Sequence, residues 1–278
     1  MLTPRIEKIR DRIRSTTPTI CLDRARIATE FYKTPSVEPY VRRRAELFKL
    51  VNETRKIYIE EDSLLVGSIA SRTHAVPVFP EMMNWLPEAV ETFDTRQFDP
   101  FQYLPGEKDE LREIANTWKG HTFGDYTDAI MTEEEQELVR IGIFTRGIQQ
   151  CSTMCHAPDY PNLVKRGYRY YIDKCKEQIA SLKDQMTIEN TDQRIKWEAM
   201  ITAMESVIAL AHRYADLAKE KATSCTDAEQ KKMYETIAEN CRVVPENPPQ
   251  NFIQAAQLVL FTHDALMTEN MGYIHALG

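Results

Sequence analysis

Residues Trp197–Ala211 read "WEAMITAMESVIALA" and occupy the middle of a long segment, Asp192–Ala222. Apolar side chains recur in it at intervals of three and four residues, at Trp197, Met200, Ile201, Met204, Val207, Ile208 and Ala211. This is the period of an α-helix that buries one face. We therefore expect a long helix here, with these side chains on its buried face.

The helical period continues through most of the chain. Helices are predicted around Ile6, Ile9 and Ile13 and at residues 23–32, 39–52, 106–118, 133–143, 162–182, 227–241 and 251–267. Two pairs, Thr132 with Glu135 and Thr226 with Glu229, match the capping box that opens many helices.

One stretch, "KIYIEEDSLLVGSIA" at residues 56–70, breaks the helical pattern. Its alternating and β-branched residues lie on either side of an acidic turn, which predicts a short strand or hairpin. Residues 72–90 hold three prolines among aromatic side chains and predict an irregular, buried crossing segment. The fold class predicted for the whole chain is mainly α with a few short strands.

The composition argues against several classes of protein. The formal net charge is −7 and the pI is about 5.5, so the basic face that binds nucleic acid is not expected. Nine glycines and no glycine-rich phosphate-binding motif argue against a nucleotide-binding fold. The first residues lack the apolar core of a signal peptide, and no apolar run approaches the roughly 20 residues of a membrane span. We expect a cytoplasmic protein with free thiols, built as one large domain or two ordinary ones.

The stretch "CSTMCHAPDYP", Cys151–Pro161, concentrates residues that can carry chemistry. Cys151, Cys155 and His156 offer three metal ligands but no second pair nearby, and the spacing has one residue too many for haem attachment. Adjacent cysteine and histidine side chains rarely face each other, which argues against a nucleophile and its base. We therefore expect no metal site here and favour a turn with packed thiols.

The end of the sequence carries an expectation of its own. The last predicted helix holds "FIQAAQLVLFTHDALM", Phe252–Met267, which is apolar on several faces and should be covered on most sides. "TENMGYIHALG" follows, and the chain stops at Gly278 with little charge to solvate it. We expect the sequence to be truncated, with the covering segments encoded further along the gene. A docked C-terminal helix with a short tail is the alternative.

Several short stretches form a recognisable series when taken in order: Asp23-Arg24-Ala25, Arg43-Arg44-Ala45, Leu64-Leu65-Val66-Gly67, Pro80-Glu81, "MTEEEQELV" at residues 131–139 and the long run at residues 212–261. Together they resemble the N-terminal part of glycyl radical enzymes. The likeness is to their pyruvate formate-lyase and glycerol dehydratase-like branch, more than to the classical pyruvate formate-lyases. It spans essentially the whole chain, although no single motif decides it.

The resemblance implies that residues 1–278 are the N-terminal part of a pyruvate formate-lyase (PFL) domain. The fold implied is the N-terminal portion of a ten-stranded α/β barrel wrapped in helices. The family's catalytic cysteine, in a G-C-x-E loop, and its radical glycine, in an R-V-x-G loop, are both absent from this sequence. The stretch "NCRVVPEN" around Cys241 lacks the glycine. We expect no catalytic residue and no bound cofactor in this chain, and no radical activity from it alone.

The resemblance also implies a reaction and partners for the intact enzyme. The reaction is radical cleavage of a C–O, C–C or C–N bond in a small polar substrate, and a protein-derived glycyl radical drives it. A radical S-adenosylmethionine activating enzyme would install that radical, and the full-length protein would form a homodimer without nucleic acid or membrane partners. The alternatives are formate C-acetyltransferase activity on a 2-oxo acid and, in another class, a non-catalytic helical scaffold.

Three residues are predicted to line the substrate pocket on the strength of the resemblance. His156 matches the histidine of a G-H-x-x-x-D-type element, whereas Asp159 lies one residue short of its aspartate and Cys155 replaces the glycine. Tyr273 stands in Gly272-Tyr273-Ile274 where glycerol-using relatives have G-H-S. This departure implies a less polar wall, and so a substrate that is larger or has fewer hydroxyl groups than glycerol.

Overall fold

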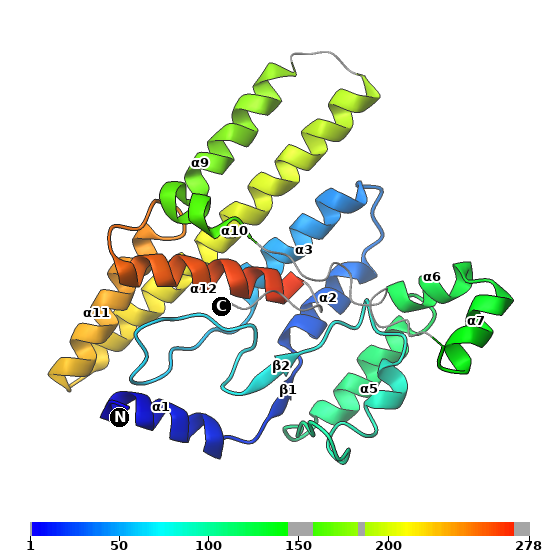
Figure 1. Cartoon of the computed structure of the whole chain (residues 1–278), viewed down its shortest axis with the longest axis horizontal. Helices are drawn as coiled ribbons and strands as arrows, with labels where there is room; N and C mark the ends of the chain where they lie inside the picture. Colours follow the sequence, from blue (N-terminus) through cyan, green and yellow to red (C-terminus); the bar gives the residue numbers. More distant parts are fainter. Residues whose placement is uncertain (1, 144–157, 183–186, 270–278) are drawn as a thin grey trace. The chain divides into compact units, whose positions relative to one another are not determined.

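The computed structural model of the chain describes residues 2–143, 158–182 and 187–269. The described residues are mainly helical and contain two short strands, so the predicted fold class is confirmed (Figure 1). Along the chain the elements are α1 (Pro4–Ser15), β1 (Thr19–Cys21), α2 (Asp23–Lys33), α3 (Tyr40–Thr54), β2 (Ala75–Pro77), α4 (Leu86–Ala89), α5 (Glu107–Trp118), α6 (Phe123–Ile130), α7 (Glu133–Arg140), α9 (Tyr160–Ser181), α10 (Ile188–Ser224), α11 (Ala228–Val243) and α12 (Phe252–Glu269).

The chain forms two compact units, each with its own hydrophobic core. The first, here called the helical unit, consists of Met1–Arg12, Pro35–Ser68 and Pro158–Ala265. The second, the mixed unit, includes among the described residues 13–34, 69–143 and 266–269. Helix α12 therefore contributes most of its length to the helical unit and its last turn to the mixed unit.

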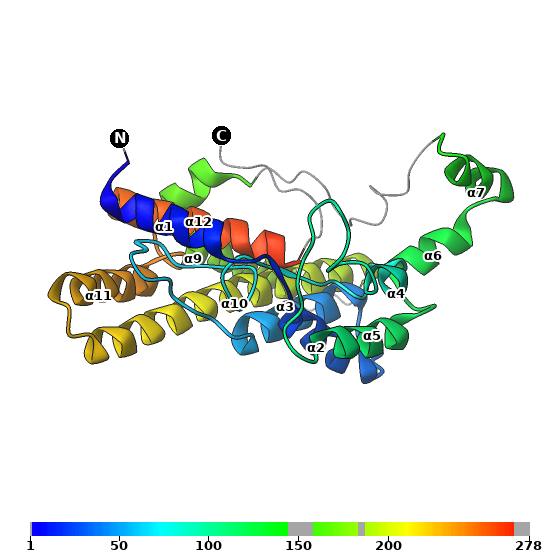
Figure 2. The same ribbon diagram turned by 90° about the horizontal axis from the view of Figure 1, so that it is seen from below.

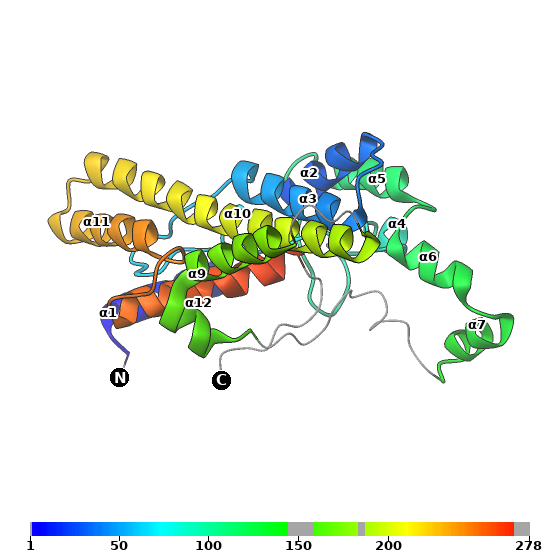
Figure 3. The ribbon, with the colours of Figure 1, turned by 90° about the horizontal axis from the view of Figure 1, so that it is seen from above.

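The long helix predicted from "WEAMITAMESVIALA" is the centre of the helical unit. It is α10, which packs against α3, α9 and α11, with α9 and α11 running back along it toward opposite ends (Figure 2, Figure 3). Val207, Ile208 and Ala211 are buried as predicted, whereas Met200 is 47 % exposed. Met200 therefore lies on an uncovered side of α10, although α3 still contacts the helix two residues earlier, where Arg42 pairs with Glu198 (2.6 Å). The ends of α9 and α10 extend beyond the other helices of this unit (Figure 1).

Polar side chains on α10 fix the end of α3. Arg213 donates hydrogen bonds to the backbone oxygens of Asn52 (2.6 Å) and Arg55 (2.7 Å). The Asn52 amide in turn donates to the hydroxyl of Ser206 (3.0 Å). The last carbonyls of a helix have no partner within it, so a guanidinium from a neighbouring helix both caps α3 and holds the two helices in register.

The hairpin predicted at residues 56–70 is wrong, because the structure has no strand anywhere in that stretch. Its backbone instead pairs with side chains distant in sequence. The amide of Gln257 on α12 accepts from Val66 N (2.9 Å) and donates to Val66 O (2.6 Å), and Arg55 donates to Ser68 O (2.5 Å). A primary amide offers one donor and one acceptor side by side, as a neighbouring strand would, so the extended chain needs no strand partner.

Gly67 allows the same segment to approach α12 closely. Its φ is +147°, a conformation that side chains other than glycine rarely adopt, and a Cβ at this position would overlap with Oδ2 of Asp264. The glycine of the "LLVG" stretch is therefore required both by the backbone conformation and by the contact.

The mixed unit is built around a parallel pair of strands. β1 pairs with β2 in the register Thr19↔Ala75, Ile20↔Val76 and Cys21↔Pro77. Next to the strands, α2 packs against α5, where Arg26 makes two hydrogen bonds to the carboxylate of Glu110 (2.5 and 2.7 Å). The buried core of this unit consists of Ile20, Leu22, Ala25, Val78, Leu86, Val90, Phe93, Leu111, Ile114 and Ala115.

The helix starts confirm one predicted capping box and correct the other. Thr132 and Glu135 form the predicted box at the start of α7. At α11 the cap is Asp227, whose side chain accepts from Gln230 N (2.7 Å), and Thr226 lies outside the helix. Aspartate caps at least as well as threonine, so the helix begins one residue later than a Thr226 box requires. Helix α6, which starts in a box formed by Thr122 and Asp125, was not predicted.

We expect Gly67→Ala to lower the free energy of unfolding by about 2–4 kcal/mol, because a methyl group must displace Asp264 while the backbone keeps a strained φ. Gly120→Ala is the matched control, since its φ is also positive (+81°) but no atom lies within 4 Å of its Cβ; about 1 kcal/mol is expected there. Urea unfolding followed by circular dichroism measures both. Equal losses in the two variants would contradict the close contact with Asp264.

Candidate functional site

Of the three residues predicted to line a substrate pocket, the structure describes Asp159. His156 and Tyr273 lie outside the described residues. Asp159 is exposed and is the N-cap of α9, where Oδ1 accepts from Asn162 N (3.4 Å) and Oδ2 accepts from Asn162 Nδ2 (2.6 Å). Its carboxylate therefore fixes the start of α9, and its contact with a substrate stays a prediction.

The start of α9 packs against α12 in the helical unit. The hydroxyls of Tyr168 on α9 and Thr262 on α12 are hydrogen-bonded at 2.9 Å, and both side chains are buried. Tyr160, the residue after Asp159, is close enough to Asp264 for that carboxylate to raise its pKa, in addition to the larger effect of burial. The helix that follows His156 and Asp159 in sequence is thus joined to the helix that precedes Tyr273.

A cluster of polar side chains is buried at this junction. Asp264 is 7 % exposed, and burial raises the pKa of its carboxyl to about 7 although the positive charge of Arg55 acts in the opposite direction. Tyr214, which is fully buried, has its pKa raised by burial above all, with a further contribution from Asp264. A carboxyl with a pKa near neutrality can hold or release a proton under physiological conditions, which an exposed aspartate does not do.

Sequence reasoning missed this cluster, although one signal was present. Asp264 is a carboxylic acid inside a nearly apolar helix, and such a group requires a buried polar environment. The spacing of residues in the sequence gave no indication of Arg55, which lies more than two hundred residues before Asp264.

In the mixed unit, a buried ion pair binds the backbone of α12 at Thr268. Arg24 and Glu81 are 2 % and 6 % exposed. Nη1 and Nη2 of Arg24 donate to the two carboxylate oxygens of Glu81 (3.1 and 2.6 Å), and Nε donates to the backbone oxygen of Thr268 (2.8 Å). The guanidinium carbon also lies 4.0 Å from the centre of the Phe79 ring. Each of the three guanidinium nitrogens thus has a partner.

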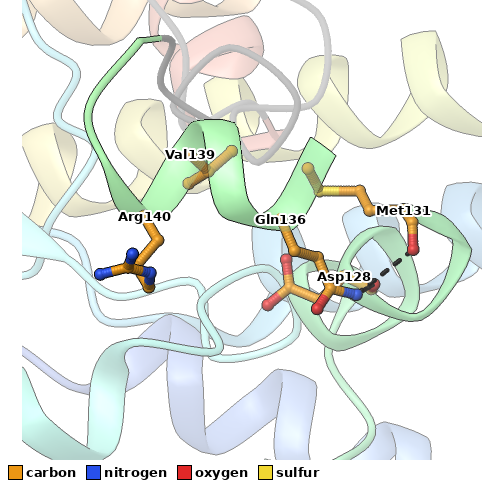
Figure 4. A pocket seen from close by; sticks show the side chains of 5 residues that line it. All are labelled: Asp128, Met131, Gln136, Val139 and Arg140. Carbon is orange, nitrogen blue, oxygen red and sulfur yellow. Dashed lines mark hydrogen bonds between the residues drawn. The ribbon is translucent and has the colours of Figure 1, made fainter. Parts of the chain in front are cut away.

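Two cavities lie within the mixed unit. One, of about 340 Å³, has an almost wholly apolar lining of Ile69, Val76, Pro77, Phe79, Met83, Trp85 and Met267. The other, of about 320 Å³, lies between α6 and α7 and is lined by Asp128, Met131, Gln136, Val139 and Arg140 (Figure 4).

The second cavity is formed by the connection between α6 and α7. The Gln136 amide donates to the backbone oxygen of Met131 (3.2 Å), which closes the connection between α6 and α7 (Figure 4). Arg140 is paired with Glu137 on its own helix. Gln136 and Arg140, which line this cavity, therefore already have partners within the chain.

Three of the four described cysteines are suited to packing. Cys21, Cys175 and Cys241 are buried, and burial raises the pKa of Cys241 to about 12. A thiol held protonated is a poor nucleophile and a poor metal ligand.

Within residues 2–143, 158–182 and 187–269, no three His, Cys, Asp or Glu side chains form a group that could hold a metal ion. In the same ranges, no helix is both long and apolar enough to cross a bilayer.

Comparison with known proteins gives consistent results. The family model described as "Pyruvate formate lyase-like" matches residues 2–278. The chain is 31 % identical to trans-4-hydroxy-L-proline dehydratase of Clostridioides difficile, over 95 % of this chain and 34 % of that protein. It is 30 % identical to isethionate sulfite-lyase of Nitratidesulfovibrio vulgaris, over 93 % of this chain and 32 % of that protein. The chain thus spans about a third of the length of the curated relatives it matches.

Solved structures agree with these matches. The glycerol-bound B12-independent glycerol dehydratase from Clostridium butyricum superposes with a TM-score of 0.92 at 29 % identity, over 97 % of this chain and 34 % of that one. A glycyl radical enzyme from Archaeoglobus fulgidus superposes with a TM-score of 0.88 at 28 % identity, over 96 % of this chain and 34 % of that one. The resemblance predicted from the sequence is confirmed.

We expect Asp264→Asn to change stability in a pH-dependent way. An unfolded aspartate loses its proton near pH 4, whereas Asp264 keeps it to about pH 7 in the folded protein, so the parent loses stability as the pH rises between these values. The uncharged variant avoids this loss and should gain on the parent by up to about 4 kcal/mol from pH 4 to pH 8. Urea midpoints at about pH 5 and about pH 8 measure the change, with the exposed Asp173→Asn as background. A difference that is the same at both values would show that Asp264 is not held protonated.

Proposed function

The chain belongs to the pyruvate formate lyase-like family, and from that premise we propose that it forms the N-terminal part of a glycyl radical enzyme of the dehydratase and lyase kind. The observation that carries the proposal is that nearly the whole chain matches proteins of that kind, both in amino-acid sequence and in the superposition of the backbone. By their names these relatives remove water or sulfite from their substrates. The reaction we propose is therefore radical cleavage of a C–O bond, or of another bond to a carbon, in a small polar substrate.

In this proposal the chain supplies the helical shell and part of the wall of the substrate pocket. A protein-derived glycyl radical would take a hydrogen atom from a cysteine thiol, and the resulting thiyl radical would take one from a substrate C–H; both residues would belong to the rest of the enzyme. The role of this chain is to exclude water and oxygen from the pocket and to present polar groups to the hydroxyls of the substrate. The residues that contact the substrate are His156, Asp159 and Tyr273. The 278-residue chain alone is inactive.

The same proposal names partners. A radical S-adenosylmethionine activating enzyme installs the radical, and the full-length enzyme is a homodimer. Formate C-acetyltransferase activity on a 2-oxo acid is the alternative within the family, and the names of the relatives favour dehydratase or lyase chemistry over it. A non-catalytic helical scaffold is the alternative from another class.

Anaerobic activation of the full-length protein tests the proposal. After incubation with its activating enzyme and S-adenosylmethionine, we expect the electron paramagnetic resonance signal of a glycyl radical. We also expect consumption of one member of a panel of small hydroxylated and sulfonated compounds. The 278-residue chain should give neither. A folded full-length protein without a radical would favour the scaffold, and turnover of a 2-oxo acid with coenzyme A would favour the acetyltransferase.

We expect His156→Ala in the activated enzyme to raise KM about tenfold or more while the radical signal is unchanged, because one hydrogen bond to a substrate hydroxyl is lost. His212→Ala is the control, since this half-buried histidine lies on α10 and faces Glu246 at 3.8 Å. If both variants have the KM of the parent, His156 does not line the pocket.

A further inference from the structure

Two polar side chains in the core of the helical unit have buried donors without a partner in the protein. Arg55, directly after α3, is 3 % exposed, and its Nη1 donates to the backbone oxygen of Ser68 (2.5 Å). Its Nε and Nη2 are buried and have no hydrogen-bond partner within the described part of the chain. Tyr214 on α10 is 0 % exposed, and its hydroxyl is likewise buried without a partner among the described residues.

The free edge of Arg55 is the one that other arginines of this chain use to bind acceptors. Nε and Nη2 of Arg26 bind the two carboxylate oxygens of Glu110. The same two atoms of Arg112 bind Glu91. Both of these arginines are about two-fifths exposed, so water could replace their partners. Arg55 is buried and keeps its charge at any physiological pH, so it has the greater need of an acceptor.

The carboxyl of Asp264 on α12 lies at the same place in the core. Arg55 binds the oxygen of Ser68, and the residue before it, Gly67, lies so close to Oδ2 of Asp264 that a Cβ there would overlap with it. Burial has the largest effect on the pKa of Tyr214 and raises it, and the charges of Arg55 and Asp264 also act on it. The guanidinium, the phenol and the carboxyl are therefore neighbours.

A water molecule suits these three groups better than an anion does. The guanidinium offers donors only, an ionised carboxylate offers acceptors only, and a phenol hydroxyl offers one of each. Water both accepts and donates, and a buried water typically makes about three hydrogen bonds to polar groups of the protein. An anion could accept from Arg55, but the carboxylate of Asp264 would repel it.

We propose that an ordered water molecule binds inside the helical unit and joins Arg55, Tyr214 and Asp264. The water accepts from the guanidinium, donates to the carboxylate and exchanges a hydrogen bond with the phenol. The site links the end of α3 with α10 and α12. It does not depend on the proposed function, because every residue in it belongs to the core of this unit.

A crystal structure of the full-length protein, at a resolution that shows ordered waters, tests the site directly. We expect a single water within about 3.2 Å of the Arg55 edge and of the Tyr214 hydroxyl. Crystals grown with bromide in place of chloride distinguish an anion, because bromide gives an anomalous signal. Bromide at the site, or no density between these groups, would overturn the proposal.

Tyr214→Phe tests the same site in solution. Removing a buried hydroxyl that has no partner leaves the helix equally stable or more stable, whereas removing one that is bonded to water leaves the water short of a partner. We therefore expect amide hydrogen exchange of residues 207–220 in the full-length protein to become about fivefold faster.

Two tyrosines of the same unit serve as matched controls. Tyr168 is buried and bonded to Thr262 (2.9 Å), so Tyr168→Phe should speed exchange in α9 by a similar factor. Tyr40 is 68 % exposed, and Tyr40→Phe should leave exchange in α3 within about twofold of the parent. Exchange in Tyr214→Phe that is as slow as in the parent, or slower, would show that the hydroxyl binds no water.

Discussion

The structure depends on the burial of α12, a helix that is apolar on most of its sides. From Ile253 to Glu269 every residue is buried or half-buried. A buried helix must also give partners to its polar groups, because a polar group buried without one costs about 1–3 kcal/mol. The other segments meet this requirement: Gln257 pairs with the backbone of Val66, Thr262 with Tyr168, and the carbonyl of Thr268 with Arg24.

This constraint accounts for three of the short stretches that carry the family resemblance. Arg24 donates to the backbone of α12 at Thr268, and Glu81 orients Arg24. The "LLVG" stretch pairs with Gln257 and makes room for Asp264 through Gly67. These residues have no common motif and lie on different segments. Their common property is a direct contact with α12 or with a residue that touches it.

Much of the helical architecture could be predicted from the sequence, because a 3.6-residue period with one apolar face is a local signal. The predictions failed where the deciding contact was remote. Residues 56–70 have the composition of a hairpin, but the backbone of Val66 within them is paired with a side chain 191 residues away. The same holds for the site: the cap of Asp159 is local, whereas the Arg24 and Glu81 pair and the burial of Asp264 depend on residues that only the fold brings together.

The proposed function requires that this chain is the N-terminal part of a glycyl radical enzyme and that the two radical-bearing residues lie outside it. Sequencing the transcript beyond codon 278, together with the intact mass of the native protein, tests this most directly. We expect an open frame that continues through a G-C-x-E motif to an R-V-x-G motif, and a native protein about three times the length of this chain, as in the relatives it matches. A stop codon directly after Gly278, with a stable native protein of 32.2 kDa, would contradict it.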